Sequence, residues 1–284
     1  MAIMPRHDVE KNPISPAHQR NPDVSQRTPY GLKVPEITVA FWIVKLLTTA
    51  MGEAASDYLL STLHYPGLGV GVVGFIVTLW LQFRARGYQP VTYWAAVSMV
   101  AVAGTMAADV IHGELGVPLA MSTLACTAAL AVTFVVWRQT EGTVSIHTID
   151  TRRREMFYWL TVSFTFALGT AAGDLTADQL GLGFLGSIVL FAVIMLVPAV
   201  SYWRFRLNAV VAFWFAYVVT RPLGASIADW LSKPARHGGL QLGDGSVAAV
   251  LLVAIVVAVV ALNGHSAITA RARRQRTSDS PTAP

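Results

Sequence analysis

The chain has 284 residues, of which 54% are hydrophobic and only 13% carry a charged side chain, with a formal net charge of +5. Soluble domains carry about twice that charged fraction, so the composition excludes an ordinary soluble fold and indicates a multi-span membrane protein. A single cysteine, Cys126, excludes a disulfide framework.

Residues 1–33 are polar and proline-containing, which predicts a disordered cytoplasmic tail rather than a signal peptide. Residues 34–268 are predicted to form one transmembrane domain, and 269–284 a second cytoplasmic tail. Eight apolar windows of bilayer-spanning length follow one another in chain order. They cover residues 38–62, 67–83, 91–111, 116–137, 156–178, 182–203, 209–231 and 246–268. The predicted fold class is therefore an all-α integral membrane protein with eight transmembrane helices.

The basic residues gather on one side of these windows. Seventeen of the 21 lysines and arginines lie in the tails and even-numbered connections, two lie on the other side, and two lie within spans. Because basic loops stay in the cytoplasm, both termini are predicted to be cytoplasmic. No surface interleaves basic and aromatic residues, so nucleic acid is not expected as a partner.

A tryptophan, a glycine and an aspartate recur four times with identical spacing, W-x9-G-x4-D. The four sets are Trp42, Gly52 and Asp57; Trp94, Gly104 and Asp109; Trp159, Gly169 and Asp174; and Trp214, Gly224 and Asp229. Each set opens a two-helix repeat, and the repeats cover about 34–86, 87–138, 152–206 and 207–268. All four start on the same side, so they are parallel repeats with internal pseudo-symmetry about the membrane normal. A fourfold ring and a pair of four-helix halves both fit this pattern.

Three segments carry a family resemblance: residues 33–37 (KVPEI), 52–54 (GEA) and 220–225 (TRPLGA). With the repeats, they resemble a bacterial family of multi-pass membrane proteins of unknown function, built from four tandem two-helix repeats with a signature tryptophan. The resemblance covers roughly residues 33–265. It implies the fold and a bacterial cytoplasmic (inner) membrane location, and it implies no activity.

The repeat places one aspartate per hairpin inside the membrane. Fifteen helical residues span about 22 Å, so a tryptophan at the cytoplasmic interface puts the aspartate in the outer third of the bilayer. A charge at the bilayer centre costs roughly 2.5–3.5 kcal/mol, so we expect the aspartates to face the bundle interior. The glycines are expected to allow close helix packing, with a substrate-facing kink as the alternative. The tryptophans are expected to anchor at the interface or pack between repeats, with ligand stacking as the alternative.

The first repeat carries an additional polar stripe at four-residue spacing: Lys45, Thr49, Glu53 and Asp57. With the other aspartates and Arg221, the core holds five carboxylates against two cations. Either some carboxylates are protonated or a cation binds, which makes the set a candidate ion site. In the alternative, Lys45 and Arg221 each bridge two aspartates in a structural network. His112, three residues after Asp109, is a further candidate for a metal ligand, and an exposed loop histidine is the alternative.

These features favour a membrane transporter of a small cation, with a divalent metal among the candidates, or of a proton-coupled solute. The expected partners are the lipid bilayer and a small cation or proton, and a homo-oligomer stays open. The alternative is a non-transporting scaffold or sensor whose buried charges are structural. No phosphate-binding loop, catalytic triad or H-E-x-x-H motif occurs, so we expect no cofactor and no enzymatic activity. An intramembrane enzyme using an aspartate pair is a third hypothesis.

Overall fold

The computed structural model describes residues 31–278, with side chains described through residue 262. This part of the chain consists of helices and connections, with no strand. The long helices are α1 (Val39–Leu63), α2 (Tyr65–Arg84), α3 (Pro90–Asp109), α4 (Leu119–Glu141), α5 (Arg152–Asp174), α6 (Gly183–Phe205), α7 (Ala209–Ser232) and α8 (Asp244–Ser278). Each predicted window corresponds to one of these helices.

The first helices of the repeats begin at recognisable sequence signals. The side chains of Thr38, Thr151 and Asn208 each accept a hydrogen bond from a backbone N–H in the first turn of α1, α5 and α7. In α3, Pro90 occupies the first turn, where no backbone donor is needed. At their other ends, α3 and α5 continue into single π-helical turns, Val110–Glu114 and Leu175–Gln179.

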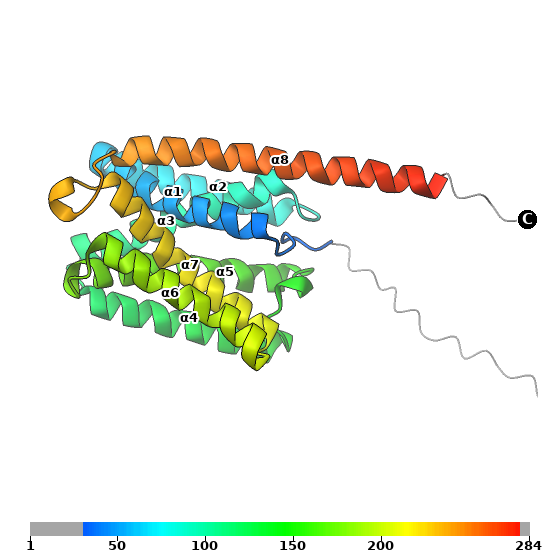
Figure 1. Ribbon diagram of the computed structural model, residues 1–284, viewed down its shortest axis with the longest axis horizontal. Coiled ribbons are helices and arrows are strands. Elements are labelled where there is room, and N and C mark those ends of the chain that lie inside the picture. Colours follow the sequence, from blue (N-terminus) through cyan, green and yellow to red (C-terminus); the bar gives the residue numbers. More distant parts are fainter. Residues whose placement is uncertain (1–30, 279–284) are drawn as a thin grey trace, which may run out of the picture.

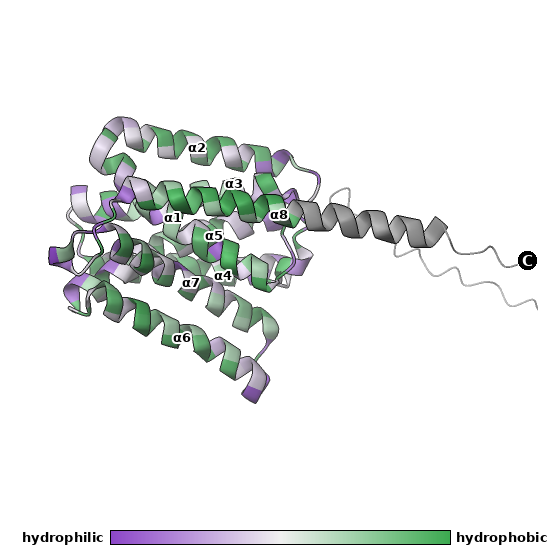
Figure 2. Cartoon of the chain, turned by 45° about the horizontal axis from the view of Figure 1, so that its top comes forward, coloured by the Kyte–Doolittle hydropathy of each residue, from purple (hydrophilic) through white to green (hydrophobic). Residues whose placement is uncertain are grey.

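Seven of the helices, α2 to α8, are long and apolar enough to cross a membrane. α1 has a similar length, but Lys45, Glu53 and Asp57 place three charges in it. Figure 2 shows apolar residues along the helices, with hydrophilic residues gathered at the two ends of the bundle. The described chain is therefore an eight-helix protein of membrane-like composition.

The four first helices form a closed ring. α1 packs against α3, α3 against α5, α5 against α7, and α7 returns to α1. In α3, α5 and α7, at least half of the residues in the apolar window are buried, whereas fewer than a quarter are buried in α2, α4, α6 and α8. The structure thus adopts the fourfold ring rather than two four-helix halves.

The second helices surround this ring and interlock the repeats. Each packs most extensively on the first helix of the following repeat: α2 on α3, α4 on α5, α6 on α7 and α8 on α1. Figure 1 shows α8 running beside α1, so the last repeat closes on the first. We call the end where each repeat turns from its first to its second helix the hairpin end, and the opposite end, where α1 begins, the terminal end.

The repeat glycines lie where neighbouring ring helices approach most closely. Each faces the residue that lies seven positions after the tryptophan of the next repeat. A Cβ atom added to the glycine would overlap that residue in every case. The pairs are Gly52 with Ala101, Gly104 with Phe166, Gly169 with Arg221, and Gly224 with Thr49. This packing accounts for a glycine in all four repeats.

Replacing Gly52 with alanine is expected to destabilise the folded protein by about 1–3 kcal/mol, because the new methyl group overlaps the Ala101 side chain and backbone. The matched control is Gly69→Ala in α2, where an added Cβ meets nothing within 4 Å. Unfolding midpoints in detergent should fall for the first variant only. Equal midpoints for both variants would contradict close packing at Gly52.

The predicted N-terminal tail lies outside the described residues except for residues 31–33, whereas the backbone of the predicted C-terminal tail is described through Ser278. Leu32 accepts a backbone hydrogen bond of 2.8 Å from Tyr88. Lys33 is buried and its Nζ lies 2.5 Å from the Glu155 carboxylate on α5. At the other end, α8 continues to Ser278, into the segment predicted as a tail. The partner of Lys33 lies 122 residues away in the chain, which no local pattern reveals.

Candidate functional site

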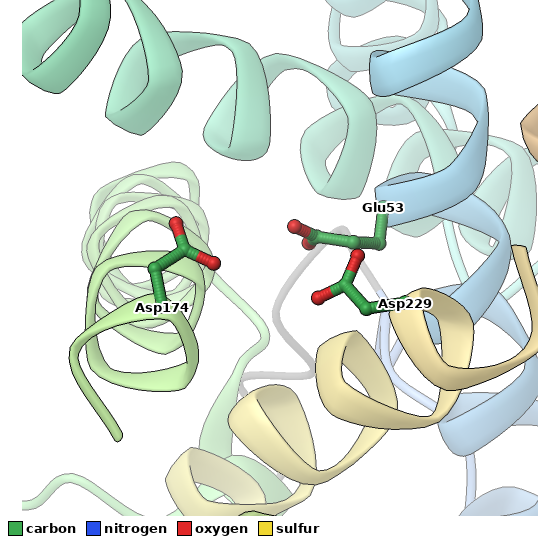
Figure 3. Close-up of side chains that lie close together, drawn as sticks. All are labelled: Glu53, Asp174 and Asp229. Atoms are coloured by element: carbon green, nitrogen blue, oxygen red, sulfur yellow. The ribbon is translucent and has the colours of Figure 1, made fainter. Parts of the chain in front are cut away.

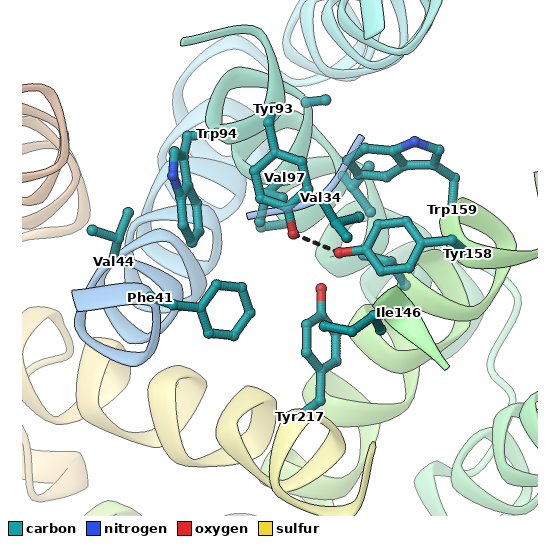
Figure 4. Close-up of a cluster of buried hydrophobic side chains, with 14 of the residues drawn as sticks. Val34, Phe41, Val44, Tyr93, Trp94, Val97, Ile146, Tyr158, Trp159 and Tyr217 are labelled. Atoms are coloured by element: carbon teal, nitrogen blue, oxygen red, sulfur yellow. Dashed lines mark hydrogen bonds between the residues drawn. The ribbon is translucent and has the colours of Figure 1, made fainter. Parts of the chain in front are cut away.

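An aromatic layer closes the ring axis near the terminal end. It consists of the residue before each tryptophan, and Tyr93 and Tyr158 share a hydrogen bond of 2.5 Å between their hydroxyl groups (Figure 4). Each member contacts the tryptophan of the next repeat, with ring centroids 5.7–6.1 Å apart. The pairs are Phe41 with Trp94, Tyr93 with Trp159, Tyr158 with Trp214, and Phe213 with Trp42. The tryptophans therefore pack between repeats.

The next layer toward the hairpin end contains a buried lysine, Lys45. Lys45 is fully buried, and its Nζ lies 3.8 Å from the ring centroid of Tyr217 and 4.7 Å from that of Phe166. Among the described residues it has no hydrogen-bond partner and no ion pair. The amino group of Lys45 therefore contacts the faces of two aromatic rings. Lys45 therefore does not bridge the aspartates.

Arg221 organises a closed polar network in the following two layers. Its Nη2 donates hydrogen bonds to the Glu53 carboxylate and to Thr170 Oγ1, both at 2.8 Å, and to Thr105 Oγ1. The two threonine hydroxyls lie 3.0 and 3.1 Å from the same Glu53 oxygen, and Arg221 Nη1 donates to the Thr49 carbonyl oxygen. All four ring helices contribute to this network. Arg221 thus binds Glu53 and does not bridge two aspartates.

These layers leave no continuous open path along the axis. The residues three, seven and eleven positions after the tryptophans have relative exposures of 3% or less. They are Lys45, Val97, Val162 and Tyr217; Thr49, Ala101, Phe166 and Arg221; and Glu53, Thr105, Thr170 and Ala225. The described part of the chain is therefore closed between the aromatic layer and the aspartates.

The four repeat aspartates form an acidic layer toward the hairpin end. Asp57, Asp109 and Asp174 are half-buried, whereas Asp229 is only 6% exposed. Ligand oxygens of Glu53, Asp174 and Asp229 lie within 4.8 Å of one another, and Figure 3 shows the three carboxylates facing each other from α1, α5 and α7. Neither Asp174 nor Asp229 has an ion pair or a side-chain hydrogen bond among the described residues. We call Glu53, Asp174 and Asp229 the carboxylate triad.

The other two aspartates have partners. Ser56 Oγ lies 3.5 Å from Asp109 Oδ2. Asp57 pairs with Lys233, whose Nζ lies 2.6 Å from Asp57 Oδ2. Lys233 is one of the two basic residues on the side of the spans opposite to the predicted cytoplasmic side, and it was not among the predicted site residues. Two sequence features could have identified Lys233 as a site residue. It lies four residues after Asp229, and it is one of only two basic residues expected on that side of the membrane.

Lys233 lies just beyond α7 and is held in its charged form. Burial lowers the pKa of Lys233, but Asp57 and Asp229 more than offset this effect and raise it above the usual value. The hairpin end therefore carries one firmly cationic side chain against the acidic layer.

His112 does not join the triad. It is exposed on the π-helical turn after α3, and its Nδ1 lies 2.8 Å from the Val117 carbonyl oxygen. Its position agrees with the exposed histidine that the sequence analysis gave as the alternative.

The triad offers the chemistry of a hard cation site. Carboxylate oxygens are the ligands that Mg²⁺, Ca²⁺ and Mn²⁺ prefer. A buried carboxylate without a partner is costly when ionised, and a bound cation or proton relieves that cost. With Glu53 held by Arg221, the carboxylates of Asp174 and Asp229 remain available to a ligand.

The comparison with protein families matches four stretches of the chain. The family described as Repeat of Unknown Function (DUF347) matches residues 40–88, 92–143, 157–208 and 212–263. These stretches coincide with the four helix pairs α1–α2, α3–α4, α5–α6 and α7–α8. Neither the comparison with curated proteins nor that with solved structures found a match. The chain belongs to the DUF347 family of repeats of unknown function.

Proposed function

We propose that the chain is an eight-span protein of a bacterial cytoplasmic membrane that transports a small cation through the acidic layer. The seven apolar helices and the basic residues at the terminal end support insertion with that end in the cytoplasm. α1 is the eighth span because its charges are shielded by the ring: Lys45 and Glu53 are buried and Asp57 is half-buried.

One observation carries the proposed cation site: Asp174 and Asp229 converge with Glu53 without a cation of their own. Asp229 is nine-tenths buried, and Figure 3 shows its carboxylate pointing at Glu53. Three helices from different repeats bring these groups together. The remaining two repeat aspartates, Asp57 and Asp109, belong to the same acidic layer. A divalent cation suits the site best, since it offsets two of the unpaired negative charges with oxygen ligands.

A transporter fits this arrangement better than a channel. The fully buried layers on the terminal side of the triad contain Arg221, whose positive charge repels a cation. Movement of a cation to the terminal end would require the Arg221 network to open. Transport therefore needs a conformational change, as in alternating access.

The alternative is a non-transporting scaffold or sensor, and the Arg221 network favours it. Glu53, Thr105, Thr170 and Arg221 form hydrogen bonds with one another inside the bundle without any ligand. If the acidic layer extends this network, the aspartates hold the repeats in register and bind no ion. The two functions differ in whether the purified protein binds a cation.

Mn²⁺ uptake by reconstituted vesicles tests the proposal. Vesicles containing the wild-type protein and an entrapped Mn²⁺-quenched dye should show saturable quenching that empty vesicles lack. The double variant Asp174→Asn/Asp229→Asn, inserted in equal amount, should behave like empty vesicles. Wild-type vesicles that take up Mn²⁺ no faster than empty ones, together with no equilibrium Mn²⁺ binding, would overturn the proposal in favour of the scaffold.

A further inference from the structure

Lys233 occupies a position that the proposed function leaves unexplained. It follows α7, and its Nζ lies 2.6 Å from Asp57 Oδ2 on α1 and 3.5 Å from Asp244 Oδ1 at the start of α8. The side chain thus joins the last repeat to the first, on the hairpin side of the acidic layer. Its side chain is 28% exposed, so it has room to move toward the surface.

Among the described residues, Lys233 is the only cation within 4.0 Å of any aspartate of the acidic layer. The two basic residues of the deeper ring layers have other surroundings: Arg221 pairs with Glu53, and Lys45 lies over aromatic rings. Lys233 therefore supplies the positive charge that a ligand would supply when it binds.

We infer that Lys233 is a tethered counter-cation that a bound cation displaces from Asp57, an inference that rests on the proposed function. A cation that binds at the carboxylate triad repels the ammonium group and weakens its pairing with Asp57. Asp244 lies within reach as a second partner, so the ammonium group moves outward without losing a carboxylate. The tether thus sets the affinity of the site.

This arrangement also selects the class of ligand. A ligand has to interact with the acidic layer more strongly than a primary ammonium does at 2.6 Å. A divalent metal ion meets this condition through its higher charge density, whereas Na⁺ and organic ammonium ions compete on equal terms with the tether. Lys233 therefore favours divalent over monovalent cations.

Equilibrium Mn²⁺ binding to the purified full-length protein, with Na⁺ as competitor, tests the inference. Lys233→Met should raise the Mn²⁺ affinity roughly tenfold and make Na⁺ a better competitor, because the tethered charge is gone. Lys233→Arg should bind like the wild type. Arg236→Met is the matched control, since Arg236 is an exposed cation three residues further along whose described contact is with His237. It should leave the affinity unchanged.

The outcomes separate the two proposals. If the wild type binds Mn²⁺ and Lys233→Met binds it no more tightly than Arg236→Met, the tether is wrong and the cation site stands. If neither the wild type nor any variant binds Mn²⁺, the proposed function fails and the tether with it. Should Lys233→Met not fold, Lys233→Gln keeps a polar side chain without the charge, and the same gain in affinity is expected.

Discussion

Replacing Asp229 with asparagine is expected to weaken Mn²⁺ binding at least about 100-fold while leaving the folded protein at least as stable as the wild type. Asp229 is the most buried member of the acidic layer, and its carboxylate faces Glu53 and Asp174 without a cation of its own. The amide removes one ligand charge and also removes a repulsion between neighbouring carboxylates, so binding and stability change in opposite directions. Equilibrium Mn²⁺ binding and chemical unfolding in detergent measure the two effects.

The matched control for this prediction is Glu114→Gln. Glu114 is exposed on the π-helical turn after α3, five residues beyond Asp109, and lies outside the triad. It should change neither quantity. If the acidic layer is purely structural, Asp229→Asn should make the protein less stable. In that case neither the wild type nor the variant should bind Mn²⁺.

Replacing Arg221 with methionine is expected to cost about 3–5 kcal/mol of unfolding free energy, because Glu53 is left buried and ionised without its partner. Methionine keeps the first side-chain carbons of Arg221, against which Gly169 packs, so the loss is electrostatic rather than steric. The double variant Arg221→Met/Glu53→Gln should recover at least half of the loss. Unfolding of the single and double variants measures this as a double-mutant cycle.

Arg138→Met provides the comparison at an exposed position of α4 and should change stability by less than about 0.5 kcal/mol. If Arg221→Met costs no more than this control, or if the double variant is as unstable as the single one, the ion pair with Glu53 does not hold the ring.

The spacing of the repeat predicted more of the fold than composition did. Identical offsets from tryptophan to aspartate placed equivalent residues on equivalent helices, so eight helices in four parallel repeats could be anticipated. The choice of a ring required knowing that Gly224 packs against Thr49, which closes the last repeat on the first. Spacing within a repeat does not reveal which repeat is the neighbour, and so both arrangements fitted the sequence.

The partners of individual charges were the least predictable part of the site. Charge counting identified Lys45 and Arg221 as the cations of the core and suggested that each bridges aspartates. Instead Arg221 binds Glu53, 168 residues away, and Lys45 lies over Tyr217. The cation that contacts the acidic layer is Lys233, 176 residues from Asp57. An axial shift of one helical turn between neighbouring helices changes which carboxylate a given cation contacts. That axial position depends on tertiary packing.

The central claim is that carboxylates from different repeats converge on one cation, and an anomalous difference map of crystals grown with Mn²⁺ tests it most directly. The account predicts a single strong peak roughly 2.0–2.6 Å from oxygens of Asp174 and Asp229, with Lys233 withdrawn from Asp57. A map without a peak at the acidic layer, in crystals whose Asp57 still pairs with Lys233 at saturating Mn²⁺, would contradict it.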